Sequence, residues 1–503
     1  MSNSLLSLLV FSPLLGIIIL AFMSKTNEKS IKLIGFLTTL LPLILSFMAF
    51  AGFDFQEKAL QFVEQRKWIA FNLGSEIPFV VDYELGINGL SLVLVLLTTV
   101  VAALAGIASI HIKKEWKGYF MLFLLLEIGM LGVFTAQNLV LWFIFFEITL
   151  IPMFFLISKW GYAEREKAAY SYLIYNGLGS AILLIVFALL FAKTGTSNIE
   201  QLKMIMGESQ EILTFLGITE NFKMGALIAL LIAFGVKLPI FPLHSWMLRV
   251  HVQAPPSIVM LHSGVLLKIG AFGLIRFGLE IFPAQFDQLA VLIAALGVIN
   301  LLYGAFLAFI QKDLKLVLAY SSISHMGIVL IGLGAMNAEG IQGAVFQAVS
   351  HGLISALLFF LISVMYERTG TTHIDSLGGL AKVMPITAGM FLAGAMASLG
   401  LPGMSGFVSE FMAFLGLFSV QPVLAAVGCI GIIMTAAYLL RAILNVTFGE
   451  TATRLTGLKD ISSVEAVPVI VLLGFIILIG VYPTVLTQAL ATTLETILLG
   501  IGG

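Results

Sequence analysis

The chain has 503 residues, of which 60% are hydrophobic and only 11% are charged, and its mean hydropathy is +1.08. No water-soluble protein of this length has such a composition, so the chain is expected to cross a membrane many times. The formal net charge is -1, and no cluster of Lys or Arg is long enough to bind a phosphate backbone, which argues against nucleic acid as a partner.

The cysteine content and the missing nucleotide motifs limit the cofactors that this chain can hold. A single cysteine, Cys429, excludes a disulfide, a cysteine-ligated zinc site and an iron–sulfur cluster within the chain. Cys429 lies in an apolar segment and is expected to be a small buried side chain. The sequence has neither a Gly-rich dinucleotide fingerprint nor a phosphate loop, so we expect no cofactor and no metal in this chain.

Apolar runs of roughly 18 to 25 residues, the length that crosses a bilayer, indicate an all-α polytopic membrane protein. We count fourteen, which start near Leu5, Ile31, Leu85, Tyr119, Asn138, Tyr170, Gly225, Pro256, Phe286, Leu314, Ile341, Met384, Pro422 and Val464. The first run lacks a basic flank and a cleavage pattern, so it is expected to be a retained span.

Two polar stretches are expected to lie outside the membrane. Asp54 to Asp82 alternates in hydrophobicity near its middle, which is typical either of a hairpin turning at Gly74-Ser75-Glu76 or of an irregular loop. Asn198 to Leu216 is expected to form a short surface helix between the sixth and seventh spans.

The distribution of Lys and Arg among the connections predicts how the chain is oriented in the membrane. Connections after odd-numbered spans hold seventeen Lys and Arg, against seven after even-numbered spans, so the odd connections are expected to be cytoplasmic. With fourteen spans, both termini would then face the outer side. The remaining two of the 26 basic residues, Lys237 and Lys268, fall inside spans.

Two spans are predicted to be broken helices. Pro239 and Pro242 interrupt the seventh span, and each removes a backbone donor and crowds the preceding turn. Pro402 and three glycines interrupt the twelfth span between Ser398 and Phe407. The breaks lie five spans apart, and because five is odd, spans four to eight and nine to thirteen would be repeats related by inversion.

This repeat predicts four segments along the chain. Residues 1–118 would hold the first three spans and the extramembrane hairpin, and residues 119–278 the first five-span repeat. Residues 279–447 would form the second, inverted repeat, and residues 448–503 the last span and a tail.

Ionisable residues inside the predicted spans indicate an ion pathway, because burying each charge costs several kcal/mol. They are Glu127, Glu147, Lys237, Lys268, His325, His351 and Glu410. Glu147 is the expected counter-charge of Lys237. At about 4 Å and an effective dielectric constant of about 20, the two would attract each other by about 4 kcal/mol.

Several of these residues also have a structural interpretation. Lys237 could hold the helix break closed through an ion pair, and Lys268 could extend toward the membrane surface. His325 and His351 could be hydrogen-bonded core residues, and Glu127, which could simply bond to a neighbouring helix, is a secondary candidate. The other histidines lie near predicted span ends and are expected to be interfacial: His111, His244, His251, His262 and His373.

Six motifs resemble the antiporter-like subunits of respiratory complex I, and among these the M type, called subunit 4 in mitochondria. They are Phe146–Met153, Val236–Trp246, His262–Lys268, Ala319–Gly327, Val349–Gly352 and Leu401–Glu410. The resemblance covers nearly the whole chain and the order of its spans.

The resemblance implies a subunit of an NADH:quinone oxidoreductase that moves protons across the membrane, driven by redox chemistry in partner subunits. The implied path consists of Glu147 paired with Lys237, followed by Lys268, His325, His351 and Glu410. Flavin and iron–sulfur clusters are expected in partner subunits, and homologous antiporter-like subunits would lie on either side. The expected location is a bacterial inner membrane, with a thylakoid or mitochondrial inner membrane as the alternative.

Other readings of the sequence stay open beside this one. The L and N subunits and the multisubunit Na+/H+ antiporters typically carry a lysine where this chain has Glu410, which favours the M type. The alternatives are a subunit of such an antiporter, of a membrane hydrogenase or of the photosynthetic relative of complex I. A haem-carrying oxidase is disfavoured because no single span offers two mid-membrane histidines. A passive scaffold would tolerate neutral residues at the buried ionisable positions.

Overall fold

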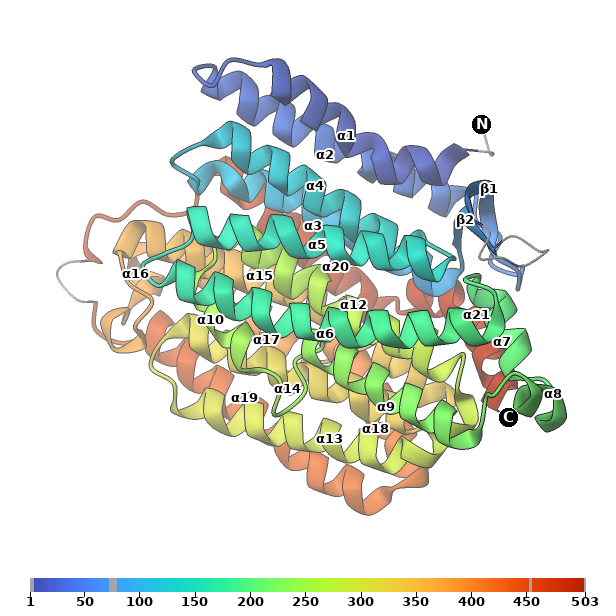
Figure 1. Ribbon diagram of the computed structural model, residues 1–503. Helices are drawn as coiled ribbons and strands as arrows, with labels where there is room; N and C mark the ends of the chain where they lie inside the picture. Colours follow the sequence, from blue (N-terminus) through green and yellow to red (C-terminus); the bar gives the residue numbers. More distant parts are fainter. Residues whose placement is uncertain (1–3, 72–78, 452–454, 502–503) are drawn as a thin grey trace.

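Long helices lie side by side in this protein, with most of its irregular segments at their two ends. The structure, a computed structural model, describes residues 4–71, 79–451 and 455–501. The β-hairpin, both termini, α7, α8 and α21 lie at one end of the bundle, and α16 lies at the other (Figure 1). We call the end with the β-hairpin the hairpin end, and the end with α16 the basic end.

Within the described residues, the helices account for all fourteen predicted spans. Twelve are single helices or one continuous helical run, and the seventh and twelfth are each made of two helices. In chain order they are α1 (Leu5–Phe22), α2 (Glu28–Ala51), α3 (Gly89–Ala108), α4 (Trp116–Thr135), α5 (Leu139–Trp160), α6 (Arg165–Thr194), α9 (Glu220–Lys237) with α10 (Ser245–Gln253), α11 (Pro256–Leu261) with α12 (Leu267–Gly273), α13 (Pro283–Ile310), α14 (Leu314–Gly334), α15 (Ala338–Thr369), α17 (Pro385–Ser398) with α18 (Ser405–Val420), α19 (Pro422–Thr447) and α20 (Ser463–Val481). The eighth span also contains two π-helical segments, His262–Leu266 and Leu274–Leu279.

The polar stretch after α2 forms a β-hairpin rather than an irregular loop. Strands β1 (Gln61–Phe71) and β2 (Phe79–Ile87) pair antiparallel. The predicted turn at Gly74-Ser75-Glu76 lies outside the described residues. The third span begins at Gly89 rather than near Leu85, because the strand continues to Ile87 and Asn88 then caps the helix by accepting a hydrogen bond from the Ser91 N–H at 2.9 Å.

Three further helices lie at the hairpin end. The segment after α6 forms two short helices, α7 (Ile199–Met206) and α8 (Gln210–Phe215), where one was predicted. The C-terminal tail forms α21 (Thr484–Ile501), which was not predicted as a helix. Its Thr493 hydroxyl accepts a hydrogen bond from the Gly89 N–H at 3.0 Å, and its Glu495 pairs with Lys58 at 2.7 Å. Since Gly89 is the first residue of α3, α21 rests on the end of the bundle, although its composition would also suit a membrane span.

The two repeats carry the same local structure at opposite ends. Asn138 caps α5, and a bridge joins it to Asn198 after α6; Asp313 caps α14, and a bridge joins it to His373 after α15. The flanking hydrogen bonds also match. Leu139 N–H donates to the Ser197 carbonyl at 2.8 Å, and Leu314 N–H donates to the Thr372 carbonyl at 2.9 Å. The first set lies beside α7 and the second near α16, so the two halves have opposite orientations (Figure 1).

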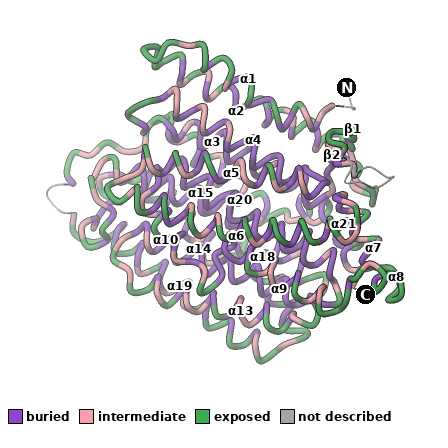
Figure 2. Tube along the Cα trace, in the orientation of Figure 1, coloured by how far each residue is buried: buried purple, intermediate pink, exposed green. Residues whose placement is uncertain are grey.

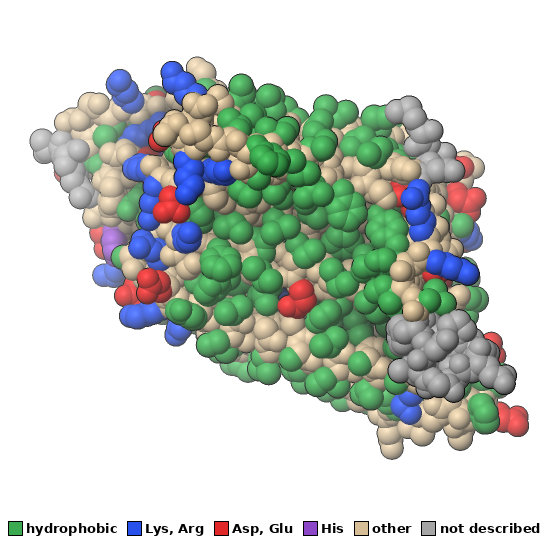
Figure 3. All heavy atoms as spheres, turned by 45° about the horizontal axis from the view of Figure 1, so that its top comes forward, with side chains coloured by type: hydrophobic (Ala, Val, Ile, Leu, Met, Phe, Trp, Pro, Cys, Tyr) green, Lys and Arg blue, Asp and Glu red, His purple; other side chains and the backbone are tan. Residues whose placement is uncertain are grey.

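Burial follows the expected membrane pattern. The apolar stretches of α15 and of the eighth span are entirely buried inside the protein, and exposed residues follow the outside of the bundle (Figure 2). Hydrophobic side chains form a broad band between two ends that carry the charges, and Lys and Arg gather mainly at the basic end (Figure 3). The prediction that Cys429 is buried is wrong, because it lies on an exposed face of α19, where an apolar side chain can face lipid as readily as protein.

Asp460 fixes the start of the broken twelfth span. Its carboxylate accepts hydrogen bonds from the backbone N–H groups of Ile386 and Thr387, at 2.7 and 3.1 Å, and from the Thr387 hydroxyl at 2.6 Å. Burial opposes ionisation of Asp460, but these donors and the N–H of Ile461 outweigh it and hold the pKa of the carboxyl below its usual range. The ionised carboxylate therefore caps α17 from a distant loop.

We expect Asp460→Asn to lower the free energy of unfolding at pH 7 by about 1 kcal/mol, the usual effect of losing a helix cap. A carboxyl with a depressed pKa stabilises the fold above its unfolded pKa of about 3.9 and loses that contribution as the pH falls further. The difference between the variant and the wild type should therefore shrink in acid. Thermal unfolding of the purified full-length chain at several pH values measures this. Asp375→Asn is the control, because that side chain is 75% exposed, and equal losses in the two variants would contradict the cap.

Candidate functional site

A side chain from the second repeat forms hydrogen bonds with the backbone at the break in the seventh span. Helix α9 ends at Lys237 and α10 begins at Ser245, so the intervening backbone lacks helical partners. The fully buried Asn300 of α13 supplies two of them. Its Oδ1 accepts from the Phe241 N–H at 2.7 Å, and its Nδ2 donates to the Pro239 carbonyl at 3.2 Å. The break is therefore an ordered element of the fold.

Lys237 lies at this break, almost completely buried. Its Nζ donates to the Tyr172 hydroxyl at 3.5 Å and lies 5.0 Å from the centre of the Phe146 ring. Glu147 is near enough to act on Lys237 electrostatically. Within the described part of the chain, the two side chains form no direct ion pair, and the Glu147 Oε1 is buried without a hydrogen-bond partner. The predicted Glu147–Lys237 pair is thus separated in this structure. The ammonium instead contacts an aromatic face and a phenol oxygen. Both groups attract a cation although neither carries a net charge. We call Lys237, Tyr172, Phe146 and Glu147 the first cluster.

Lys268 begins a second cluster in the middle of the protein. The side chain is fully buried. Its Nζ donates to the Ser263 carbonyl, which belongs to the π-helical segment of the same span, and lies 2.8 Å from Nδ1 of His351. When Lys268 is protonated it can only donate, and a neutral His351 then accepts through Nδ1 and carries its own proton on Nε2.

His325 continues the cluster toward the twelfth span. Its Nδ1 accepts from the Gln347 amide at 3.2 Å and lies 3.6 Å from the Glu410 carboxylate, while its Nε2 lies 3.2 Å from the Ser398 hydroxyl. The centres of the His325 and His351 rings are 5.7 Å apart. These groups surround a small cavity with about 10 Å³ open to a water molecule, which is roughly what one water needs.

The break in the twelfth span brings Glu410 to this cluster. Gly400 there has a positive φ of 79°, and a Cβ at this position would lie only 2.7 Å from the Glu410 carboxylate. A side chain would therefore displace the carboxylate and strain the backbone. Glycine at the Pro402 break allows Glu410, on α18, to approach the broken backbone closely.

Two histidines that were predicted to be interfacial lie between the clusters. His251 and His262 are fully buried, and His251 Nε2 lies 2.9 Å from His262 Nδ1. The His262 ring packs 5.3 Å from Trp246 and 6.0 Å from Tyr172, the partner of Lys237. The interfacial prediction is wrong for this pair because α10 and the eighth span pack deep inside the bundle. The outer ring nitrogens of both histidines are buried without a partner.

Sequence reasoning also missed the neutral residues of the site. Tyr172, Gln347, Ser398 and Asn300 each bond to a candidate residue or to a helix break, but none carries a charge that makes it unusual in a span. Glu127 stands apart: it is fully buried, and neither of its carboxylate oxygens has a hydrogen-bond partner. In the part of the chain that the structure describes, no group of three His, Cys, Asp or Glu is placed to hold a metal ion.

Comparison with known proteins identifies the family. The family model described as "NADH:quinone oxidoreductase/Mrp antiporter, TM" matches residues 136–435. NADH-quinone oxidoreductase subunit M of Rhodobacter capsulatus is 37% identical over 97% of this chain and 94% of the relative. The chain belongs to this family. NAD(P)H-quinone oxidoreductase chain 4 2 of Thermosynechococcus vestitus is 39% identical over 98% of this chain and 91% of the relative.

The three-dimensional comparison agrees. A chain of respiratory complex I from Thermus thermophilus with bound NADH superposes with a TM-score of 0.84 and 28% identity, covering 99% of this chain and 100% of that one. The match to the NADH:quinone oxidoreductase/Mrp antiporter family includes every member of both clusters, whereas Glu127 falls before it. The family assignment thus covers the whole candidate site.

We expect Asn300→Leu to destabilise the protein, because it removes both hydrogen bonds that the amide makes to the helix break. The carbonyl of the buried Pro239 loses its donor, whereas Phe241 is 36% exposed, so the total loss should be roughly 1–3 kcal/mol, the cost of one buried unpaired group. Thermal unfolding of the full-length chain measures it. Asn176→Leu is a matched control, since that buried amide bonds only to the Tyr172 carbonyl of its own helix and its oxygen has no partner. A loss no greater than that of the control would contradict the role of Asn300.

Proposed function

We propose that this chain is the proton-translocating membrane subunit of an NADH:quinone oxidoreductase, with the redox centres in partner subunits. The observation that carries the proposal is the buried run from Lys268 through His351 and His325 to Glu410, in a chain related along its whole length to subunit M. Each neighbouring pair can exchange a proton directly or through one water. The chain itself makes and breaks no covalent bond.

The second cluster supplies the conducting steps. Lys268 donates to His351 across 2.8 Å, and a proton taken up at His351 Nδ1 can leave from its Nε2. His325 then receives the proton and faces the Glu410 carboxylate at 3.6 Å. Gln347 and Ser398 bond to the two nitrogens of the His325 ring and orient it. Glu410 is the last group, at the break through which the proton would leave the cluster.

The first cluster would control when a proton enters. With Glu147 separated from Lys237, the ammonium is held by the Tyr172 phenol and aromatic rings. Approach of the carboxylate would stabilise the charged form of Lys237, and withdrawal would favour release of its proton. The His262–His251 pair is the route by which that proton would reach Lys268. An imidazole can accept a proton at one nitrogen and donate one from the other, and both rings lie between the two lysines.

The partners are proposed to be membrane subunits of the same complex, with antiporter-like subunits on either side. Glu147 supports this because its side chain is only half-buried within this chain, and a carboxylate facing lipid is costly. A neighbouring subunit would cover it. We place the odd-numbered connections, and so the basic end, on the cytoplasmic side.

A Na+/H+ antiporter subunit is the alternative within the same family. Sodium-dependent proton movement without an electron donor would identify it, whereas proton movement that requires electron transfer identifies the oxidoreductase. Such antiporters typically carry a lysine at the position of Glu410. The glutamate of this chain therefore favours the oxidoreductase.

Glu147→Gln should reduce proton pumping per electron in the assembled complex. The variant loses an interaction on the order of 1–4 kcal/mol that would stabilise the protonated form of Lys237, enough for roughly tenfold weaker proton uptake by the lysine. Pumping in vesicles, normalised to quinone reduction, measures it. Glu166→Gln, an exposed carboxylate at the start of α6, is the control. Unchanged pumping in Glu147→Gln would remove this residue from the mechanism.

Tyr172→Phe tests the resting position of Lys237. Losing a hydrogen bond to a charged group costs about 1.5–3 kcal/mol, so we expect roughly tenfold slower pumping with the complex still assembled. Tyr170→Phe makes the same chemical change two residues earlier, on a side chain that is 58% exposed, and should pump normally. If both variants pump alike, the phenol has no part in proton transfer.

A further inference from the structure

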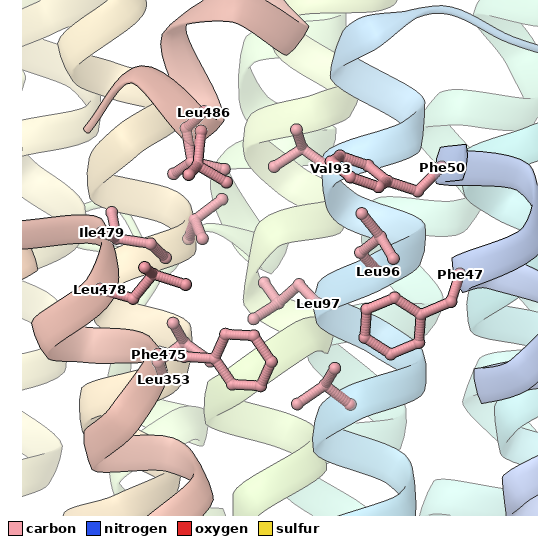
Figure 4. Close-up of a pocket in the computed structure, with 13 residues that line it drawn as sticks. Phe47, Phe50, Val93, Leu96, Leu97, Leu353, Phe475, Leu478, Ile479 and Leu486 are labelled. Atoms are coloured by element: carbon pink, nitrogen blue, oxygen red, sulfur yellow. The ribbon is translucent and has the colours of Figure 1, made fainter. Parts of the chain in front are cut away.

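Two pockets lie along one seam on the outside of the bundle, where α2 and α20 pack on either side of α3. The pocket nearer the hairpin end is entirely apolar, and its side chains from α2, α3 and α20 point toward one another (Figure 4). Among its residues are Phe47, Phe50, Leu97, Phe475 and Leu486. It holds about 240 Å³ and offers no polar group to a ligand.

The second pocket lies on the same seam at the basic end. Its volume is about 490 Å³, and Phe36, Gly106, Ile107 and Val467 form part of its apolar wall. Phe36 here and Phe47 in the first pocket are eleven residues apart on α2, a distance of about 16 Å at the helical rise of about 1.5 Å per residue. The two pockets therefore belong to opposite halves of the bilayer.

The rim of the second pocket carries a cation without a counter-charge. Lys32 Nζ lies 3.7 Å from the centre of the Trp116 ring, and both residues line the pocket. Within the described ranges, Lys32 forms no ion pair and the Trp116 indole N–H has no acceptor. Nearby donors are satisfied instead: Lys117 donates to the Ala21 carbonyl at 2.8 Å, and the Trp160 indole donates to the Lys114 carbonyl at 2.8 Å.

We propose that this second pocket binds an anionic glycerophospholipid of the cytoplasmic leaflet. The acyl chains would lie against the apolar wall, and the phosphate would accept hydrogen bonds from Lys32 and the Trp116 indole. Two other occupants fit the pocket less well. A free phosphate ion would leave the apolar wall uncovered, and an apolar helix of another protein would offer no anion to Lys32. Basic pockets between spanning helices on the cytoplasmic side favour anionic headgroups.

Lys32→Gln tests the headgroup contact. The full-length chain is placed in nanodiscs of equimolar palmitoyl-oleoyl phosphatidylglycerol and phosphatidylcholine, and the lipids retained on release are counted by native mass spectrometry. The wild type should retain phosphatidylglycerol in preference, and Lys32→Gln should lower that preference about fivefold, the effect of about 1 kcal/mol for one lysine beside an anionic lipid. Lys29→Gln makes the same charge change one turn earlier on an exposed residue outside the pocket and should keep the wild-type preference.

Gly106→Leu tests the acyl site. A Cβ there would lie 3.4 Å from the Thr39 hydroxyl oxygen and 3.5 Å from Phe36, both ordinary contacts, so the longer side chain should fill the pocket and reduce retention of both lipids without loss of thermal stability. Cross-linking with a photoactivatable phosphatidylglycerol in the assembled complex gives a readout that needs no variant. Labelled peptides should come from the start of α2 and the start of α20. The proposal is overturned if Lys32→Gln and Lys29→Gln behave alike, or if the label instead marks a partner subunit seated on this seam.

Discussion

A lysine buried in an apolar helix bundle must find acceptors for its protons, and this requirement shapes both polar clusters. Lys268 uses the Ser263 carbonyl of a π-helical segment, where the widened turn alters the usual backbone pairing, together with a histidine nitrogen. Lys237 is the last residue of α9. The carbonyl end of a helix carries partial negative charge, which favours a cation there. Irregular helices are thus what allow charge inside this membrane protein.

The inverted repeat supplies the frame, and the charged residues then differ between its halves. Asn138 and Asp313 show that the same capping structure recurs with opposite orientation. Spans five to seven contribute Glu147, Tyr172 and Lys237, whereas spans ten to twelve contribute His325, His351 and Glu410. Lys268 comes from the first repeat but bonds within the cluster of the second. It therefore connects the two halves chemically as Asn300 connects them structurally.

The sequence predicted the spans, the two broken helices and the buried ionisable residues, because hydropathy, proline and charge are local properties. It did not predict which of these residues touch. The separation of Glu147 from Lys237 depends on how α5, α6 and α9 pack, and the His251–His262 contact joins two spans across a turn. Tyr172 and Asn300 are unremarkable as residue types, and only their positions in the packed bundle make them partners of a lysine and of a broken backbone. Helix α21 was missed because its apolar face covers helix ends.

The two clusters differ in their access to the outside of the chain. Lys268, His351 and His325 are enclosed by helices of this chain on every side, so only residues within the chain can act on them directly. Glu147 is half-buried on α5, and its charge acts on Lys237. A neighbouring subunit that alters the field beside Glu147 would therefore act first on Lys237, and on the enclosed cluster only through it. In the proposed proton path, this order would set a direction, from a lateral edge that partners can reach to an interior that they cannot.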